Sequence, residues 1–235
     1  MKKQKKHIPN LLTCLNLLSG CVACVAAFDG NFILAGYWVF VGAAFDFSDG
    51  FAARKLKSYS SVGKELDSLA DMVTFGVAPG VTVFKFLELS LFQFEFTGVS
   101  YIPYIAFLLV IFSAIRLAKF NVDKRQTTSF IGLPTPANAL FWMSLMVALE
   151  KHLLMSIYIP VGIILLVFVF SLLLVAEISM FSLKVNNLSW KGNSLRYILL
   201  FCVLTFLLIF GFGGIYLGVI TYILLSFGKH LFGNK

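Results

Sequence analysis

Long apolar stretches separated by short polar turns dominate the hydrophobic pattern of this sequence. Six of these stretches lie at residues 11–28, 32–53, 66–87, 102–118, 137–149 and 156–176. A membrane-spanning helix needs about 20 mostly apolar residues, and most of the stretches approach that length. We therefore expect an all-α, polytopic membrane helix bundle.

A seventh apolar stretch, residues 195–227, is too long for one helix of ordinary tilt. Its middle contains Gly211, Gly213, Gly214 and Gly218, and glycine permits a tight reversal of the chain. We expect two short spans here, which gives eight transmembrane helices in total. Because no linker is long enough to separate two domains, residues 1–235 are expected to form a single integral-membrane domain.

Composition and charge agree with this interpretation. The chain is 59% hydrophobic and 13% charged, about half the charged share of roughly 25% in soluble domains. With eight helices and both termini in the cytoplasm, all of the 19 Lys and Arg except Lys85 and Lys151 fall on the cytoplasmic side. The net charge of +8 therefore reflects topology in the lipid bilayer, and it gives no case for a nucleic-acid partner.

Four aspartates interrupt the second and third apolar stretches. Asp46 and Asp49 are three residues apart, and Asp67 and Asp71 are four apart, so each pair lies on one helix face. The two helices are expected to be antiparallel neighbours, which lets all four carboxylates converge near the cytoplasmic side. Ionised aspartates are costly inside a membrane and usually mark a functional site.

Carboxylate oxygens are suitable ligands for Mg²⁺, Mn²⁺ or Ca²⁺ rather than zinc. Four of them are enough for two metal ions that would assist displacement at phosphorus. Gly50 and Gly63 would admit a close approach of the backbone to a ligand, and Arg54 offers a fork of donors suited to phosphate. On these grounds alone, a cation transporter explains the cluster as well as a phosphoryl-transfer enzyme does.

The spacing resembles the signature DxxDGxxARx8GxxxDxxxD of the CDP-alcohol phosphotransferase family. Every fixed position is matched, by Asp46, Asp49, Gly50, Ala53, Arg54, Gly63, Asp67 and Asp71. Residues 8–10, 75–79, 116–121, 132–137 and 181–184 resemble, in the same order, segments of the phosphatidylserine synthase branch. The resemblance extends to about residue 185, so it implies a catalytic core at about 8–185, followed by an additional transmembrane hairpin at 195–228.

This resemblance implies a homodimeric enzyme of the cell inner membrane, with its active site open to the cytoplasm. Such an enzyme transfers the phosphatidyl group of CDP-diacylglycerol to the hydroxyl of L-serine. Four aspartates would hold two divalent ions, Mg²⁺ or Mn²⁺ in preference to Ca²⁺, and the last would also act as general base: Asp46, Asp49, Asp67 and Asp71. The implied contacts to the CDP moiety are Gly50, Ala53, Arg54 and Gly63.

The acceptor site leaves alternatives open. Arg116, Lys119 and Asn121 would bind the serine carboxylate or would anchor the helix end at the membrane surface. Within the same family, phosphatidylglycerophosphate or phosphatidylinositol-phosphate synthesis would use Lys119, Lys124 and Arg125 for the phosphate of the acceptor.

Two further groups of polar residues also have two interpretations each. Asn10, Thr13 and Asn16 lie near one face of the first helix, where they would line the nucleotide site or hold helices together. Glu177 is either an extra metal ligand or an interfacial carboxylate paired with Lys184.

Overall fold

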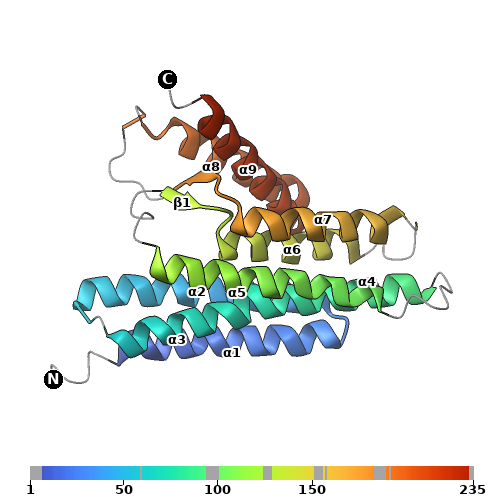
Figure 1. The fold of residues 1–235 in the computed structure, drawn as a ribbon, viewed down its shortest axis with the longest axis horizontal. Coiled ribbons are helices and arrows are strands. Elements are labelled where there is room, and N and C mark those ends of the chain that lie inside the picture. Colours follow the sequence, from blue (N-terminus) through green and yellow to red (C-terminus); the bar gives the residue numbers. More distant parts are fainter. Residues whose placement is uncertain are drawn as a thin grey trace.

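The computed structural model describes residues 7–58, 60–93, 101–123, 129–150, 156, 158–182, 189–190 and 192–232. Nearly all of this chain is helical (Figure 1). The α-helices are α1 (Ile8–Phe28), α2 (Phe32–Leu56), α3 (Ser61–Asp71), α4 (Ala78–Gln93), α5 (Phe107–Val122), α6 (Thr135–Leu149), α7 (Tyr158–Val175), α8 (Ser194–Phe210) and α9 (Ile215–Phe232). Three short turns complete them: the π-helical η2 (Met72–Val77) and the 3₁₀-helical η3 (Ile102–Ala106) and η5 (Gly211–Gly214).

Six helical segments of the described chain are long and apolar enough to cross a membrane. They are Ile8–Phe28, Phe32–Leu56, Ser61–Phe92, Ile102–Val122, Tyr158–Val175 and Ser194–His230. The third segment joins α3, η2 and α4 into one helical run, and the last contains both α8 and α9. The prediction of a multi-pass helical membrane protein is therefore confirmed, whereas the count of eight spans stays a prediction.

The last apolar stretch reverses direction at its glycines, as predicted. Gly211 ends α8 with a φ of +62°, and the chain turns through η5 into α9. The two helices are in close contact, because a Cβ on Gly218 of α9 would lie only 2.6 Å from Cγ2 of Val203 in α8. Arg196, near the start of α8, and Lys229, near the end of α9, line the same cavity. The two helices thus form an antiparallel hairpin, which lies obliquely to the other helices in Figure 1.

Basic side chains gather at one end of the bundle. The start of α1, the end of α2 and the start of α3 meet there, because Pro9, Arg54 and Gly63 line a common cavity. Lys64 Nζ donates a hydrogen bond to the main-chain oxygen of Asn121 at 3.2 Å, which brings the end of α5 to the same place. These ends lie together at the left of Figure 1.

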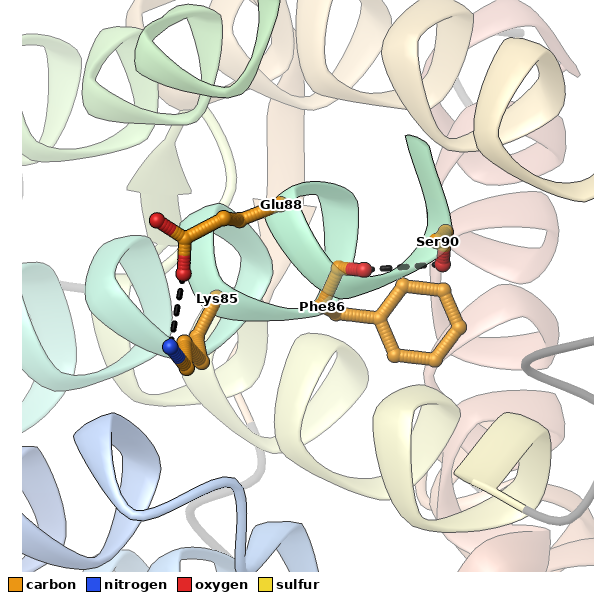
Figure 2. Close-up of polar contacts among 4 residues, drawn as sticks. All are labelled: Lys85, Phe86, Glu88 and Ser90. Carbon is orange, nitrogen blue, oxygen red and sulfur yellow. Dashed lines mark hydrogen bonds and ion pairs between the residues drawn. The ribbon is translucent and has the colours of Figure 1, made fainter. Parts of the chain in front are cut away.

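Lys85 is one of the two basic residues predicted for the opposite side of the membrane. It lies in α4 and forms an ion pair with Glu88 at 2.6 Å (Figure 2). Ten of the 19 basic residues of the topology prediction lie outside the described residues: Lys2, Lys3, Lys5, Lys6, Lys124, Arg125, Lys151, Lys184, Lys191 and Lys235. The orientation of the chain in the membrane therefore stays a prediction.

The short helix α6 lies at the centre of the core. Apolar side chains lie on all sides of this helix of 15 residues, which is typical of a fully surrounded helix. Phe141 stacks on Phe170 of α7 with ring centroids 3.9 Å apart, and Trp142 and Met146 are fully buried. The neighbouring helices α2, α4, α7 and α9 therefore pack around α6.

Two short strands are the part of the fold that the hydrophobic pattern did not predict. β1 (Ser129–Ile131) pairs with β2 (Ser179–Phe181) in antiparallel register, with Phe130 opposite Met180. Gly132 follows β1 with a φ of +78°, and a Cβ there would lie 2.6 Å from the main-chain oxygen of Leu174. The strand pair therefore holds the segment before α6 next to the segment that follows α7.

Candidate active site

Three of the four predicted carboxylates come together. Asp46 and Asp49 on α2 and Asp67 on α3 each offer an oxygen, and these atoms lie within 4.8 Å of one another. The helices meet because a tight turn joins them, in which Lys57 has a φ of +51° and the Ser60 side chain caps α3. The i, i+3 spacing on α2 then directs both of its carboxylates toward α3.

Asp71 lies one turn further along α3 and does not belong to this group of three. Its Oδ1 accepts a hydrogen bond from Nδ2 of Asn16 on α1, at 3.1 Å. Asn16 is fully buried, so the position of its amide is fixed by packing. Asp71 thus lies beside the group of three, and its hydrogen bond from Asn16 connects it to α1.

Thr13, one turn before Asn16, makes a similar contact with another aspartate. Its Oγ1 donates a hydrogen bond to Oδ2 of Asp49 at 2.6 Å, and both side chains are buried. The polar face of α1 was predicted to line the nucleotide site or to hold helices together. In the structure, Thr13 and Asn16 orient two of the carboxylates.

The cluster has the chemistry of a cation site. Among the described residues, no Lys or Arg pairs with Asp46, Asp49 or Asp67, and Oδ1 of Asp67 is buried without a hydrogen-bond partner. Two unit negative charges 4.8 Å apart would repel each other by about 3 kcal/mol at an effective dielectric constant of 20. An all-oxygen donor set of this kind fits a hard divalent cation.

A first cavity, of about 220 Å³, opens beside the cluster at the end of α1, α2 and α3. All four residues predicted to contact CDP line this cavity: Gly50, Ala53, Arg54 and Gly63. A Cβ on Gly63 would lie 2.9 Å from Oγ of Ser60 and 3.0 Å from Oδ1 of Asn10, so glycine keeps this space open. The lining residues are Pro9, Asn10, Thr13, Asp49, Gly50, Ala53, Arg54, Ser58, Ser60, Gly63, Lys64 and Asp67.

A second cavity, of about 380 Å³, lies on the other side of Asp67. Asp67 and Lys64 line both cavities, whereas Asp71 and Arg116 line the second and not the first. Asn121 also lines the second cavity, and its Nδ2 donates to Oγ of Ser68 at 2.8 Å. The remaining lining residues are Leu117, Phe120, Phe130, Pro134, Thr135 and Pro136.

The residues predicted to bind the acceptor do not all line the same cavity: Arg116 and Asn121 line the second, whereas Lys119 does not. Arg116 is 4% exposed and its guanidinium carbon lies 5.4 Å from the ring centre of Phe120. Lys119 instead faces a third cavity, of about 340 Å³, together with Glu177 and Arg116. Lys184, the predicted partner of Glu177, lies outside the described residues.

Some lining residues were not predicted. Ser68 directly follows a signature aspartate, and Thr135 lies in a segment that carries the resemblance, so the sequence contained a signal for both. Phe130 reaches the cavity from the strand pair, for which the hydrophobic pattern gave no signal.

Fold and site together define a multi-pass helical membrane protein with a carboxylate cluster, suited to divalent cations, between two cavities at one end of its bundle. The chain belongs to the CDP-alcohol phosphatidyltransferase family, whose model matches residues 6–173. This match contains the four aspartates and ends before β2 and the α8–α9 hairpin.

Curated relatives agree with this assignment. The chain is similar to a CDP-diacylglycerol–serine O-phosphatidyltransferase of Bacillus subtilis, with 38% identity over 130 residues, 55% of this chain and 70% of the relative. An enzyme of the same name from Helicobacter pylori is 37% identical over 133 residues, 56% of this chain and 53% of the relative. An archaetidylserine synthase of Methanothermobacter thermautotrophicus is 32% identical over 134 residues, 56% of this chain and 54% of the relative. The alignments to the last two thus span about half of the relatives' length.

Proposed function

We propose that this protein transfers the phosphatidyl group of CDP-diacylglycerol to the hydroxyl of L-serine, which yields phosphatidylserine and CMP. The observation that carries the proposal is that Asp67 lines both cavities while Asp71 lines the second. A donor in the first cavity and an acceptor in the second would then meet at the carboxylates. The names of the relatives are consistent with serine as the acceptor.

The first cavity is the proposed site of the cytidine diphosphate. Arg54 provides a planar pair of donors for phosphate oxygens, and Asn10 offers an amide to the polar head. Gly50, Ala53 and Gly63 leave the space that the nucleotide fills, because none of them carries a side chain beyond Cβ. The diacylglycerol tails would then extend from this end of the bundle into the bilayer.

The proposed ligands of two divalent ions are Asp46, Asp49, Asp67 and Asp71. The chemistry supplied by the bound ions, Mg²⁺ or Mn²⁺ in preference to Ca²⁺, is neutralisation of the charge on the pyrophosphate and on the departing CMP. The three clustered carboxylates and the unpartnered Oδ1 of Asp67 support this assignment.

The second cavity is the proposed site of serine. Arg116 faces this cavity and would bind the serine carboxylate, and Asp71 would accept the proton of the serine hydroxyl. The serine oxygen then forms a bond to the phosphorus that carries diacylglycerol, and the bond from this phosphorus to the bridging oxygen of CMP breaks. Positioning of the two substrates supplies much of the rate enhancement in such a site.

An acceptor that carries a phosphate is the alternative within the family. Lys119 was one of three predicted ligands for such a phosphate, and it lines the third cavity instead of the second. The other two, Lys124 and Arg125, lie outside the described residues. Serine is therefore preferred as the acceptor because of the names of the relatives.

We also propose a topology and an assembly. Eight transmembrane helices would include α6 and each arm of the α8–α9 hairpin, with both termini and the active site on the cytoplasmic side of the cell inner membrane. Residues 8–185 would form the catalytic core of a homodimer. The gathering of basic residues at the end that holds both cavities supports this orientation.

An acceptor screen tests the proposed function. Purified protein in detergent is given CDP-diacylglycerol, Mn²⁺ or Mg²⁺, and one acceptor at a time: serine, glycerol 3-phosphate or inositol phosphate. We expect CMP release with serine and little with the others. Release with a phosphorylated acceptor alone would move the enzyme to another branch of the family, and metal uptake by vesicles without CMP release would support a transporter.

A further inference from the structure

The hydroxyl of Thr74 differs from most Ser and Thr hydroxyls in the described helices, because it bonds to the main chain of another helix. Ser90 donates to the main-chain oxygen of Phe86, four residues earlier in its own helix, at 2.8 Å (Figure 2), and Thr82 donates to Ala78 at 2.7 Å. This local bond is the usual pattern for Ser and Thr inside helices. Thr74 Oγ1 instead donates across to α1, to the main-chain oxygen of Asn16, at 2.9 Å.

The π-helical turn η2 explains this difference. Thr74 lies within it, where the hydrogen-bond ladder is wider than in an α-helix, so the carbonyl four residues earlier is not the natural partner. Single π turns of this kind often occur at functional sites. Thr74 is fully buried, and its hydroxyl satisfies its hydrogen bond on a neighbouring helix.

Two glycines allow the close approach that this contact requires. A Cβ on Gly20 of α1 would lie 2.5 Å from Oγ1 of Thr74 and 2.8 Å from its Cα. A Cβ on Gly42 of α2 would lie 2.6 Å from Cγ2 of the same threonine. Thr74 therefore occupies the point where α1, α2 and η2 touch.

The hydrogen bond from Thr74 to Asn16 connects Thr74 to Asp71, the proposed base. Thr74 holds the main chain of Asn16, and the side chain of Asn16 donates to Oδ1 of Asp71, three residues before Thr74. A carboxylate that is fixed through one oxygen is oriented for proton transfer through the other. A displacement of α1 at this point would weaken the hydrogen bond from Asn16 that orients the carboxylate.

We propose that Thr74 is a positioning residue for Asp71, and that it acts through Asn16. The proposal rests on the role of Asp71 in the proposed function. In this proposal the π turn lets the hydroxyl of Thr74, in the third membrane segment, bond to α1, which is the first.

The test compares three variants of the protein in phosphatidylserine synthesis. We expect Thr74→Val, which keeps the shape but removes the donor, to lower kcat about tenfold with little change in the KM for CDP-diacylglycerol. Thr74→Ser keeps the donor and should restore most of kcat. Thr82→Val is the matched control, because that buried hydroxyl bonds within its own helix, and it should retain wild-type kcat.

A double-mutant cycle separates positioning from simple loss of stability. Asn16→Ala keeps the main-chain acceptor but removes the amide, so it should lower kcat to a similar extent, and Thr74→Val should then add little. Additive losses, or a wild-type kcat in Thr74→Val, would overturn the proposal. If Thr74→Val does not fold, a low kcat in Thr74→Ser would overturn it as well.

A second measurement does not depend on activity. Nuclear magnetic resonance of the protein with ¹⁵N-labelled asparagine reports the side-chain amide of Asn16, which Asn16→Ala identifies. We expect this resonance to shift in Thr74→Val and to stay in place in Thr74→Ser and Thr82→Val. An unchanged resonance in Thr74→Val contradicts the proposal even if the acceptor proves to be another molecule, whereas the absence of any transferase activity counts against the proposed function alone.

Discussion

At the scale of single residues, the four signature aspartates have different surroundings. Asp46, Asp49 and Asp67 form one group, whereas Asp71 is held by Asn16 and faces the second cavity. Membership of one motif therefore does not imply identical surroundings. Metal binding is proposed for all four, and the contact with Asn16 and the second cavity support proton transfer as a further role of Asp71.

Asp71→Asn tests this division of roles. The amide cannot accept the serine proton, so kcat should fall at least about 100-fold, measured as CMP release. Asp29→Asn is a suitable control, because Asp29 is exposed in the turn between α1 and α2, and it should keep full activity. An Asp71→Asn variant with near wild-type turnover would exclude this residue as the base.

Thr13→Val tests the support of the metal site. Loss of the 2.6 Å hydrogen bond to Asp49 should raise the metal concentration for half-maximal activity about tenfold. Thr205→Val removes a hydroxyl that bonds only within α8 and should leave the metal dependence unchanged. The same shift in both variants would show that the bond to Asp49 is not the cause.

The sequence contained enough information for the carboxylate cluster but not for its hydrogen bonds. Spacings of three and four residues place each pair on one helix face, whatever the rest of the fold does. Which carboxylate meets Thr13 or Asn16 depends on the rotation and depth of α1 against α2 and α3. That arrangement results from packing across the bundle, which one-dimensional spacing does not record.

At the scale of elements, the helices and the final hairpin were predictable, whereas the strand pair and the π turn were not. Hydrophobic length determines a span, and glycine clusters mark reversals. Each strand has only three residues, and their pairing joins segments about 50 positions apart in a chain where apolar helices dominate the signal. The π turn, Met72–Val77, likewise continues an apolar helix without any break in the hydrophobic pattern.

Gly132→Ala tests the importance of the strand pair for the second cavity. The positive φ and the nearby oxygen of Leu174 leave no room for a Cβ, so the substitution should destabilise the protein by at least about 2 kcal/mol. We expect a lower apparent Tm in detergent and weaker serine binding, seen as a raised KM. Gly162→Ala in α7 meets no atom within 4 Å and should leave both quantities unchanged or raise the Tm slightly. Equal effects of the two substitutions would contradict this account of Gly132.

At the scale of the whole molecule, the separation of charge predicts which end faces the cytoplasm. The end with Arg54 and Lys64 holds both cavities, and the ion pair of Lys85 and Glu88 lies in α4, in the later part of the third membrane segment. A substrate from the cytoplasm would therefore reach the carboxylates without crossing the bilayer.

Cysteine labelling in cells tests this orientation, with the wild-type chain as background. A membrane-impermeant thiol reagent should label Asp29→Cys in intact cells, because this residue lies in the turn between α1 and α2. Lys57→Cys, in the turn between α2 and α3, should react only after the cells are opened. The reverse pattern would invert the topology and place the active site outside the cytoplasm.

The central claim is that a serine hydroxyl in the second cavity attacks the phosphorus of a donor in the first. The most direct measurement uses L-serine labelled with ¹⁸O in its hydroxyl group, with CDP-diacylglycerol and a divalent metal, and mass spectrometry of both products. We expect phosphatidylserine that retains the label in its phosphodiester and CMP that contains none. Release of CMP without labelled phosphatidylserine, or label in CMP, would contradict the proposed transfer.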